Sequence, residues 1–220
     1  MSERTYYPVM LDITGRRCLV VGGGEVAARK VEALLACGAR PTVVAPEVTG
    51  ALAGLAAAGA IEIQRRAYQP GDLEGAFLVI AASDDPDVNA AAYREASSRG
   101  ILVNVVDNPA QCTFLVPSVV RRGRITVAIS TSGASPALAA HLRRELEQVI
   151  GPEYGALADL LARLRPEVMQ QIADPEVRRR AWQAILASDV LDLLRRGESA
   201  QAEQVALECI AAGGRNGRAD

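Results

Sequence analysis

The sequence predicts an α/β fold whose first half is a doubly wound parallel sheet, followed by a small α+β segment and a C-terminal helical domain. Three observations carry this prediction. Strand-like and helix-like patterns alternate through the first half of the chain, three glycines join the first strand to the first helix, and the pattern is purely helical from Gly151 onward. Strand–helix alternation with a glycine turn after the first strand is typical of Rossmann-like folds.

The five expected strands of the sheet are short, rich in valine and isoleucine, and almost continuously apolar. Such runs favour parallel strands that are covered on both faces. The strands are expected at residues 17–21, 41–45, 61–65, 77–81 and 101–106, and the helices between them at 25–37, 48–58 and 86–99.

After residue 107 the rhythm changes. Two further strands are expected at 114–120 and 124–129, and a loop of small residues leads into a helix over 136–150, with Ser135 as its N-cap. Further helices are expected at 152–165 and 175–187, with shorter ones to about residue 212. We therefore divide the chain into a sheet domain (1–113), a segment of strands and one helix (114–150), a helical domain (151–212) and a tail expected to be disordered (213–220).

The composition indicates a soluble protein with a sizeable core. Of the 220 residues, 50% are hydrophobic but only 4% are aromatic, so alanine, valine and leucine must supply most of the packing. The net charge of −2 argues against a nucleic-acid partner, because such proteins normally carry a basic patch. No apolar run is long enough to span a membrane and the N-terminus has no apolar signal core, so we expect a cytoplasmic location. Of the four cysteines, Cys18 and Cys37 fall in apolar patterns and are interpreted as reduced, buried thiols.

The glycine turn has the spacing Gly22-x-Gly24-x-x-Ala27 and is the strongest indication of a ligand. Gly22 can adopt the sharp turn out of the strand, Gly24 leaves room for a pyrophosphate, and Ala27 allows close packing of helix on strand. The helix that starts near Glu25 presents its positive end and its free N–H groups to the anion. The sequence therefore predicts a dinucleotide site; the alternative is a tight strand–helix turn with no ligand.

Three more strand ends fall at the same edge of the predicted sheet. The second strand ends at Pro46 and Glu47, with no basic residue beside it, which favours NAD over NADP because an acidic residue there can bind the ribose hydroxyls. The alternative for Glu47 is that it simply starts the next helix. Ala82 and Ser83 follow the fourth strand. Ser83, Asp84 and Asp85 are interpreted as helix caps ahead of Pro86.

Asp107 is the candidate acid–base group, because it follows Val106 at the end of the fifth strand. A carboxylate at this edge can exchange protons with a substrate. The alternative is a plain Asp turn before Asn108-Pro109, and position alone does not separate the two. His141, the single histidine, is interpreted as a partly exposed helix residue, and one histidine without paired cysteines argues against a resident metal site.

Arginines flank the small-residue loop at 130–136. They include Arg121, Arg122, Arg124, Arg143 and Arg144, and are either a solvated surface or binding groups for carboxylates, through paired N–H donors.

Four ordered motifs resemble one known family, the precorrin-2 dehydrogenase/sirohydrochlorin ferrochelatase family, which also forms the N-terminal part of siroheme synthase. The motifs are Val-Val-Gly-Gly-Gly-Glu-Val-Ala-Ala-Arg-Lys (20–30), Asn-Val-Val-Asp-Asn-Pro (104–109), Phe-Leu-Val-Pro-Ser (114–118) and Ala-Ile-Ser-Thr-Ser-Gly-Ala-Ser-Pro (128–136). Tyr-Pro-Val-Met-Leu at 7–11 also looks like the family's opening. The resemblance covers about residues 6–150, and the helical remainder is similar only in length and character.

The resemblance implies a cofactor, a reaction and a set of site residues. It implies oxidation of precorrin-2 to sirohydrochlorin with NAD, and in several members also insertion of ferrous iron. It implies a homodimer formed through the segment 114–150. Asp107 would be the catalytic carboxylate, and Thr131 stands where some members have a serine. The cofactor-binding residues would be Gly22, Gly23, Gly24, Glu25, Val26, Ala27, Pro46, Glu47, Ala82, Ser83 and Val106. The substrate-binding residues would be Ser130, Thr131, Ser132, Gly133, Arg121 and Arg124.

Two other functions stay open at this point. The chain can be a non-catalytic NAD-sensing module, which needs no tetrapyrrole site, or an oxidoreductase for another substrate.

Overall fold

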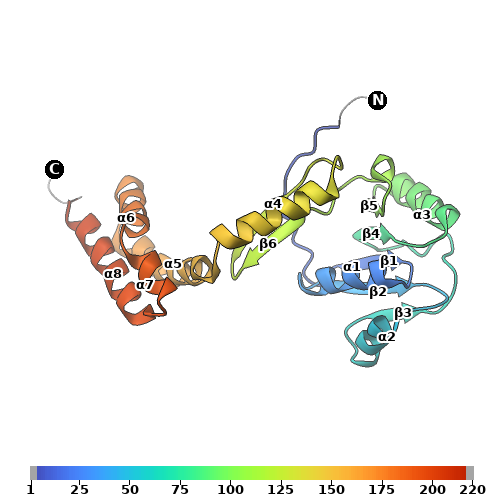
Figure 1. Ribbon diagram of the computed structural model, residues 1–220, viewed down its shortest axis with the longest axis horizontal. Helices are drawn as coiled ribbons and strands as arrows, with labels where there is room; N and C mark the ends of the chain where they lie inside the picture. Colours follow the sequence, from blue (N-terminus) through green and yellow to red (C-terminus); the bar gives the residue numbers. More distant parts are fainter. Residues whose placement is uncertain (1–3, 217–220) are drawn as a thin grey trace. The chain divides into compact units, whose positions relative to one another are not determined.

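The structure is a computed structural model that describes residues 4–216, with side chains described to residue 212 (Figure 1). It divides into two compact units. The first, called here the sheet unit, contains the chain up to Val116 together with Ser132–Ala134. The second, the helical unit, contains Pro117–Thr131 and the chain from Ser135 onward.

The sheet unit contains the predicted parallel sheet. Its strands are β1 (Arg17–Val21), β2 (Arg40–Val44), β3 (Glu62–Gln64), β4 (Leu78–Ala81) and β5 (Leu102–Val105), and its helices are α1 (Glu25–Leu35), α2 (Gly50–Ala57), α3 (Pro86–Arg99) and the short 3₁₀ helix η1 (Pro109–Gln111). All pairs are parallel and the order is β3-β2-β1-β4-β5. The chain order reverses between β1 and β4, which is where ligands bind in open sheets of this kind.

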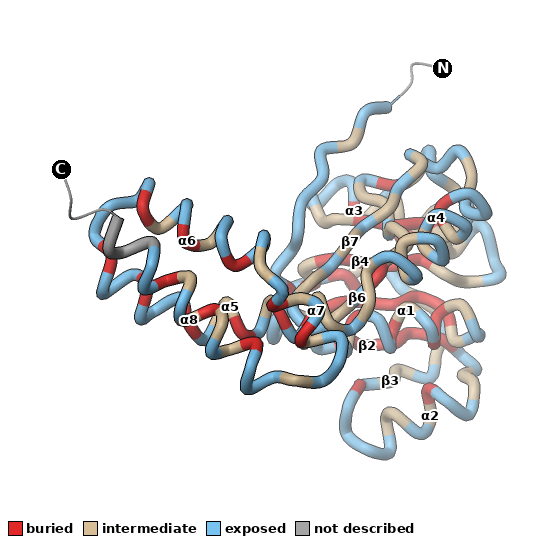
Figure 2. Tube along the Cα trace, turned by 60° about the vertical axis from the view of Figure 1, so that its left-hand side comes forward, coloured by how far each residue is buried: buried red, intermediate tan, exposed pale blue. Residues whose placement is uncertain are grey.

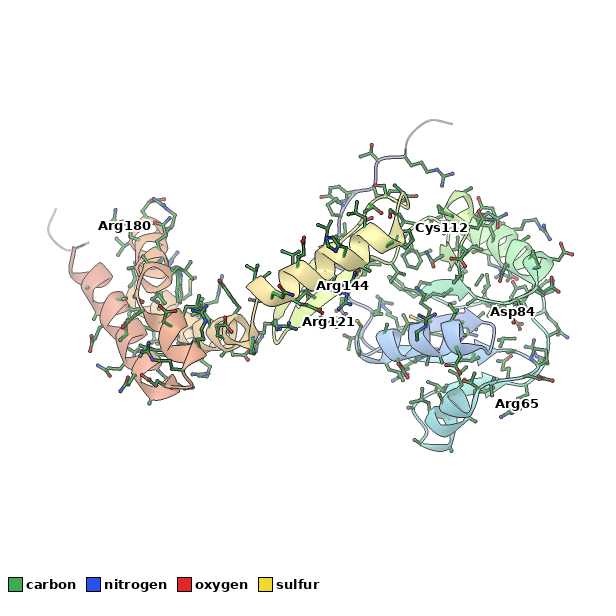
Figure 3. All side chains as sticks on the ribbon, viewed as in Figure 1. Arg65, Asp84, Cys112, Arg121, Arg144 and Arg180 are labelled. Atoms are coloured by element: carbon green, nitrogen blue, oxygen red, sulfur yellow. The ribbon has the colours of Figure 1, made fainter. Side chains whose placement is uncertain are left out.

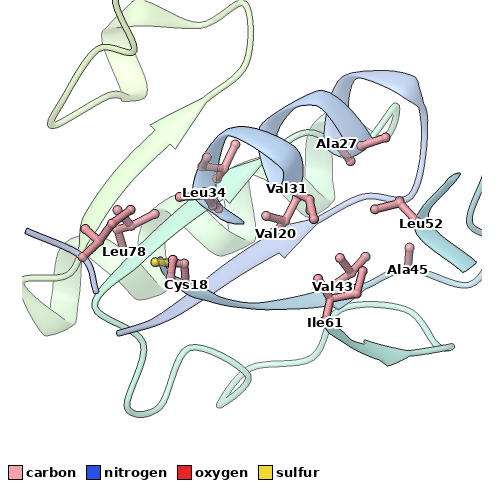
Figure 4. Packing of buried hydrophobic residues seen from close by; sticks show 14 residues of the cluster. Cys18, Val20, Ala27, Val31, Leu34, Val43, Ala45, Leu52, Ile61 and Leu78 are labelled. Atoms are coloured by element: carbon pink, nitrogen blue, oxygen red, sulfur yellow. The ribbon is translucent and has the colours of Figure 1, made fainter. Parts of the chain in front are cut away.

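Alternate residues of each strand serve the two faces of the sheet. Cys18 and Val20 belong to the cluster that packs against α1 and α2 (Figure 4). Leu19 and Val21 belong to a second cluster, which includes Ala92 of α3. Because helices cover both faces, the strands are apolar throughout, as their sequences predict.

The outer edge of β5 is covered by the chain that follows it rather than by a strand. Thr113 donates its N–H to the Val103 carbonyl at 2.8 Å, and its Oγ1 accepts from the Val103 N–H at 2.8 Å. The predicted strand at 114–120 is therefore wrong in its first half, since residues up to Phe114 lie along β5. Pro117 has no N–H to pair, and strand β6 begins only at Ser118.

The helical unit begins with a hairpin and one helix. β6 (Ser118–Arg122) and β7 (Ile125–Ile129) are antiparallel, and α4 (Pro136–Val149) packs against β6. Ser135 is the N-cap of α4, as predicted, with its Oγ 3.1 Å from the Leu138 nitrogen.

Four further helices complete this unit: α5 (Pro152–Gln171), α6 (Pro175–Ala187), α7 (Val190–Arg195) and α8 (Ser199–Asn216). Buried positions recur along α5, α6 and α8 in Figure 2. Two predicted ends are wrong. α5 continues through Pro166, because its buried stripe extends to Val168, and α8 includes the first four residues of the predicted tail. Residues 217–220 of that tail lie outside the described residues.

Within residues 4–216, no helix has the length and apolarity needed to cross a bilayer. Cys18 is fully buried, as predicted, and Cys37 is only partly buried.

Candidate dinucleotide-binding and active site

Gly22 holds the turn that leads out of β1. Its φ of +119° lies in a region that residues with a side chain rarely adopt. A Cβ added here would lie 2.6 Å from the Ala82 carbonyl carbon and 2.9 Å from the Ser83 nitrogen. Glycine is therefore required for the close approach of the loops after β1 and β4, in addition to the turn that the sequence predicts.

Gly23 is equally constrained, although the spacing rule gives it no role. A Cβ on Gly23 would overlap the Glu47 carbonyl oxygen and lie 3.0 Å from the Ala45 Cβ. The Gly23 carbonyl accepts from the Thr49 N–H at 2.9 Å. The glycine turn is thus fixed between the loop after β2 and the loop after β4.

Gly24 has the open surroundings that a phosphate cradle needs. It is exposed, and a Cβ placed on it would meet no described atom within 4 Å. It is also the N-cap of α1, whose first intrahelical bond runs from the Ala28 N–H to the Gly24 carbonyl at 3.0 Å. The N–H groups of Glu25, Val26 and Ala27 therefore precede the helical ladder and can donate to an anion. Ala27 is fully buried, as its packing role requires. These residues fit the pyrophosphate of a dinucleotide.

The loop after β4 is held in place by a residue that sequence reasoning missed. Asn89 on α3 accepts from the Ser83 N–H at 3.1 Å and donates to the Ser83 carbonyl at 2.8 Å. Asp85 is the N-cap of α3, and Ser83 Oγ accepts from the Asp85 N–H at 3.2 Å, so the interpretation of this loop as a helix cap is confirmed. No local pattern singles out Asn89, because it is an isolated polar residue between Val88 and Ala90 and its partner lies in the loop before the helix.

The strand ends follow one another across the sheet. The Ala82 N–H donates to the Val21 carbonyl at 2.7 Å, and the Val106 N–H donates to the Ala81 carbonyl at 2.9 Å. Pro46 and Glu47 follow β2 and are exposed. The residues predicted to bind the cofactor thus all lie at the carboxyl edge of one sheet.

Asp107 lies at the same edge, exposed and with φ at +58°. This left-handed conformation is uncommon for a residue with a side chain, although Asp and Asn tolerate it better than most. The Asn108 N–H closes the turn on the Val105 carbonyl at 3.2 Å. The carboxylate therefore stands on a sharp turn immediately beyond the sheet.

A half-buried cation, Lys30 of α1, shares this region. Burial lowers the pKa of Lys30, the neighbouring charge of Arg29 lowers it further, and Asp107 and Cys112 act in the opposite direction. Lys30 is therefore close enough to Asp107 for the two charges to interact. It lies inside the first motif, but spacing alone gives no reason to single it out.

The residues predicted to bind substrate divide between the two units. Ser132 and Gly133 belong to the sheet unit, where a Cβ on Gly133 would lie 3.4 Å from the Pro109 Cγ, next to the Asp107 turn. Thr131 belongs to the helical unit, and its hydroxyl accepts a hydrogen bond from the Ser135 N–H of the same loop at 3.0 Å. The remaining three, also in the helical unit, are Arg121, Arg124 and Ser130.

Arg124 pairs with Asp159 of α5 at 2.8 Å, with both side chains largely exposed. Arg121 is also exposed and is labelled in Figure 3. His141 is exposed and lies 3.4 Å from Glu145, which confirms its interpretation as a surface residue of a helix. Among the residues that the structure describes, no group of three or more His, Cys, Asp or Glu side chains could hold a metal ion.

A glycine turn at the reversal point of a parallel sheet, followed by an exposed helix N-terminus, defines a dinucleotide-binding protein of the Rossmann-like class. Comparison with protein families agrees. Residues 9–118 match a family described as "Putative NAD(P)-binding", residues 122–148 match "Sirohaem biosynthesis protein central", and residues 153–209 match "Sirohaem synthase dimerisation region".

Similar proteins give the same result. The chain is 42% identical to a siroheme synthase of Methylococcus capsulatus over 97% of its own length and 45% of the relative's. It is 44% identical to a siroheme synthase of Pseudomonas entomophila, over 91% of its own length and 43% of the relative's. A solved structure titled SirC, precorrin-2 dehydrogenase, matches with a TM-score of 0.74 and 29% identity, over 94% of this chain and all of that one.

The chain thus spans less than half the length of these curated relatives. It belongs to the precorrin-2 dehydrogenase/siroheme synthase family, as the four motifs predict.

Proposed function

We propose that the chain catalyses the NAD-dependent oxidation of precorrin-2 to sirohydrochlorin in siroheme biosynthesis. The observation that carries the proposal is the placement of Asp107 at the sheet edge that also bears the open Gly24 turn. The similarity of nearly the whole chain to a structure titled precorrin-2 dehydrogenase supports this substrate.

The chain's own residues have three tasks in this reaction. The N–H groups of Glu25 to Ala27 and the space above Gly24 would hold the pyrophosphate, with Glu47 at the adenosine ribose and Ala82, Ser83 and Val106 along the cofactor. Bound NAD would supply a hydride acceptor. The oxidation removes one hydride and one proton from the substrate, and the Asp107 carboxylate would accept the proton.

Precorrin-2 carries several carboxylates, which need cations and hydroxyls around them. Arg121 and Arg124, with Ser130, Thr131, Ser132 and Gly133, are the proposed substrate-binding residues. Arginine suits this task because its planar fork can donate two hydrogen bonds to one carboxylate.

The test is turnover of precorrin-2 with NAD, followed by the absorbance of NADH and of sirohydrochlorin. We expect Asp107→Asn to lower kcat by about 100-fold or more, as loss of a general base does, with the affinity for NAD unchanged. The control is Asp87→Asn, which removes an exposed carboxylate from the first turn of α3 and should keep wild-type turnover. Unchanged turnover in Asp107→Asn would remove this residue from the mechanism.

The same assay separates the alternative, an NAD-sensing module. A sensing module would bind NAD, would form neither NADH nor sirohydrochlorin, and would tolerate Asp107→Asn without consequence.

The proposal also covers a second substrate, the oligomeric state and its interface, the location and the domain bounds. Ferrous iron would be a second substrate if sirohydrochlorin and Fe²⁺ give siroheme in the same preparation, where Asp107 would again take up protons.

The chain would form a homodimer in the cytoplasm, and its domains would be 1–113, 114–150 and 151–212. The dimer interface is proposed for 114–150, and the match of 153–209 to a dimerisation region makes the later helices a second candidate.

A further inference from the structure

Cys112 is a buried thiol that bonds the backbone on both sides of Asp107. It lies in the loop after β5, is 5% exposed, and is labelled in Figure 3. Its Sγ lies 3.2 Å from the Val105 nitrogen, 3.3 Å from the Val105 carbonyl oxygen and 3.3 Å from the Asn108 carbonyl oxygen. Val105 is two residues before Asp107 and Asn108 is one residue after it. One sulfur atom therefore forms hydrogen bonds to the backbone on both sides of the turn.

The Cys112 thiol forms the hydrogen bonds to β5 that a further strand of the sheet would otherwise form. β5 is the last strand of the sheet, and its outward N–H and C=O groups need partners because buried backbone groups are costly to leave unpaired. Thr113 supplies hydrogen-bond partners for the N–H and C=O groups of Val103, and Cys112 Sγ supplies them for those of Val105. Asn104, one of the two buried polar residues described, supports this arrangement by donating to the Phe114 carbonyl at 3.1 Å and to Cys112 Sγ at 3.5 Å.

The turn itself needs such a restraint. The φ of +58° at Asp107 is unfavourable for a residue with a Cβ, and such conformations persist only where the surroundings hold them. Within the described residues, Asp107 and Ser132 are the two non-glycine residues with positive φ. Without the sulfur, the segment 105–108 keeps a single hydrogen bond across the turn, from the Asn108 N–H to the Val105 carbonyl.

We propose that Cys112 is a positioning residue: its thiol fixes the left-handed turn at Asp107 and so aims the carboxylate at the substrate. The proposal rests on the proposed function, in which Asp107 accepts the substrate's proton. Cys112 acts through hydrogen bonds alone, with no change in its own bonding or oxidation state during turnover.

The surroundings keep the sulfur in the form that this role needs. Burial raises the pKa of the Cys112 thiol, while the Val105 N–H and the positive charges of Arg4 and Lys30 act against it. The group therefore stays a neutral thiol, with one hydrogen to donate and lone pairs to accept. That hydrogen can reach either the Val105 or the Asn108 carbonyl, since both lie at 3.3 Å.

The experiment compares Cys112→Ala, Cys112→Ser and Thr113→Val in the full chain. Thr113→Val is the matched control, because it removes the two side-chain hydrogen bonds to Val103 from the same edge of β5 but keeps the backbone bond and does not touch the Asp107 turn. We expect Cys112→Ala to lower kcat for sirohydrochlorin formation about tenfold, as small misplacements of catalytic groups do, with KM for NAD within about twofold of wild type. Cys112→Ser keeps a donor and an acceptor and should recover most of this loss. Thr113→Val should keep kcat within about twofold of wild type.

Combination with Asp107→Asn shows whether Cys112 acts through Asp107. In the Asp107→Asn background, Cys112→Ala should lower kcat no further, because residues that act as one unit are not additive. A full tenfold loss in that background, or an equal loss in Thr113→Val, would overturn the proposal.

A measurement without turnover keeps the test independent of the proposed function. In Cys112→Ala, hydrogen exchange of the Val105 amide should accelerate at least tenfold, and the HN–Hα coupling and carbon shifts of Asp107 should move away from left-handed values. In Thr113→Val, hydrogen exchange of the Val103 amide should accelerate instead, and that of the Val105 amide should not. If the wild-type chain forms no sirohydrochlorin, the proposed function fails, and these spectra alone decide whether Cys112 holds the turn; unchanged spectra in Cys112→Ala would refute it.

Discussion

The sheet unit and the four C-terminal helices are built on different principles. In the sheet unit, loops approach so closely that Gly22 and Gly23 admit no Cβ, and polar groups such as Asn89 and Asn104 hold the segments that follow β4 and β5. In the helices α5 to α8, the buried side chains are leucine, isoleucine, valine and alanine at helical spacing, and charges such as Arg163–Glu203 and Arg179–Glu176 pair at the surface. The two buried polar residues described for the chain, Thr42 and Asn104, both belong to the sheet unit.

The comparison distinguishes the sheet unit, where chemistry can occur, from the helices α5 to α8, where packing is the main requirement. A site needs polar atoms that are fixed by bonds to the backbone, and the sheet edge supplies them. Most core positions of α5 to α8 need only volume and apolarity, so they should tolerate conservative exchange that the glycine turn does not. The exception is Gly155 of α5, where an added Cβ would lie 2.9 Å from the Arg122 carbonyl carbon. Four sets of substitutions test this contrast.

The largest effect is expected at the glycine turn. Gly23→Ala should destabilise the sheet unit by more than about 3 kcal/mol, because the new methyl group overlaps the Glu47 carbonyl. Gly24→Ala should cost about 1 kcal/mol or less, the difference between these residues at an N-cap, while the affinity for NAD falls at least about tenfold because the methyl occupies phosphate space.

Urea unfolding and titration with NAD measure the two quantities. Wild-type affinity for NAD in Gly24→Ala would show that the pyrophosphate does not lie at this turn.

The second effect should be confined to the helical unit. Leu160 of α5 is 2% exposed, so Leu160→Ala should cost about 3 kcal/mol through the lost burial and the cavity left behind. The affinity for NAD should stay within about twofold of wild type. Thermal unfolding followed by circular dichroism, together with NAD titration, checks both; a parallel loss of NAD affinity would mean that the units are energetically coupled.

The third effect compares two matched helix caps. Asp85 of the sheet unit accepts from the Asp87 N–H at 2.8 Å, and Asp174 of the helical unit accepts from the Glu176 N–H at 2.8 Å. Alanine at either position should cost about 1 kcal/mol, the usual value of an N-cap. Only Asp85→Ala should weaken NAD binding, since α3 begins at the Ser83 loop. Equal NAD affinities in the two variants would refute a role for that loop in the cofactor site.

The smallest effect is a pH dependence of the sheet unit. Hydrogen bonds from Arg66, at 2.6 and 2.8 Å, hold the pKa of the Asp72 carboxyl below its ordinary value. A lowered pKa in the folded state stabilises the protein above the pKa of the unfolded chain, about 4, and this contribution disappears as the pH falls through the lowered value. The stability difference between wild type and Asp72→Asn, measured by urea unfolding, should therefore be present at pH 6 and shrink below pH 4; a constant difference would contradict it.

Much of the sheet unit could be predicted from the sequence because its signals are local. Apolar runs of the right length predict β1 to β5, and the spacing Gly22-x-Gly24-x-x-Ala27 predicts the turn at the reversal point. The proline-first helix over Pro86–Arg99 was predicted to the residue, since Asp85 before it and Gly100 after it are strong end signals.

Features that depend on tertiary contacts could not be predicted in this way. Nothing in the pattern shows that Gly23 meets Glu47, that Asn89 holds Ser83, or that Cys112 reaches Val105, because each partner lies in another loop or element. Pro166 is a local signal that tertiary packing overrides, since the buried stripe of α5 continues past it. The roles assigned to the cofactor- and substrate-binding residues stay predictions until the assays above are done.

The side-chain cover on β5 also bears on how the protein behaves at high concentration. A sheet with an open edge offers unpaired amides to other chains and can seed fibres. Here the segment 112–114 occupies one edge, and the strand at the other edge, β3, is three residues long and carries Glu62. Chains that lose this cover would expose a template for intermolecular pairing, so we expect Cys112 and Thr113 also to limit aggregation.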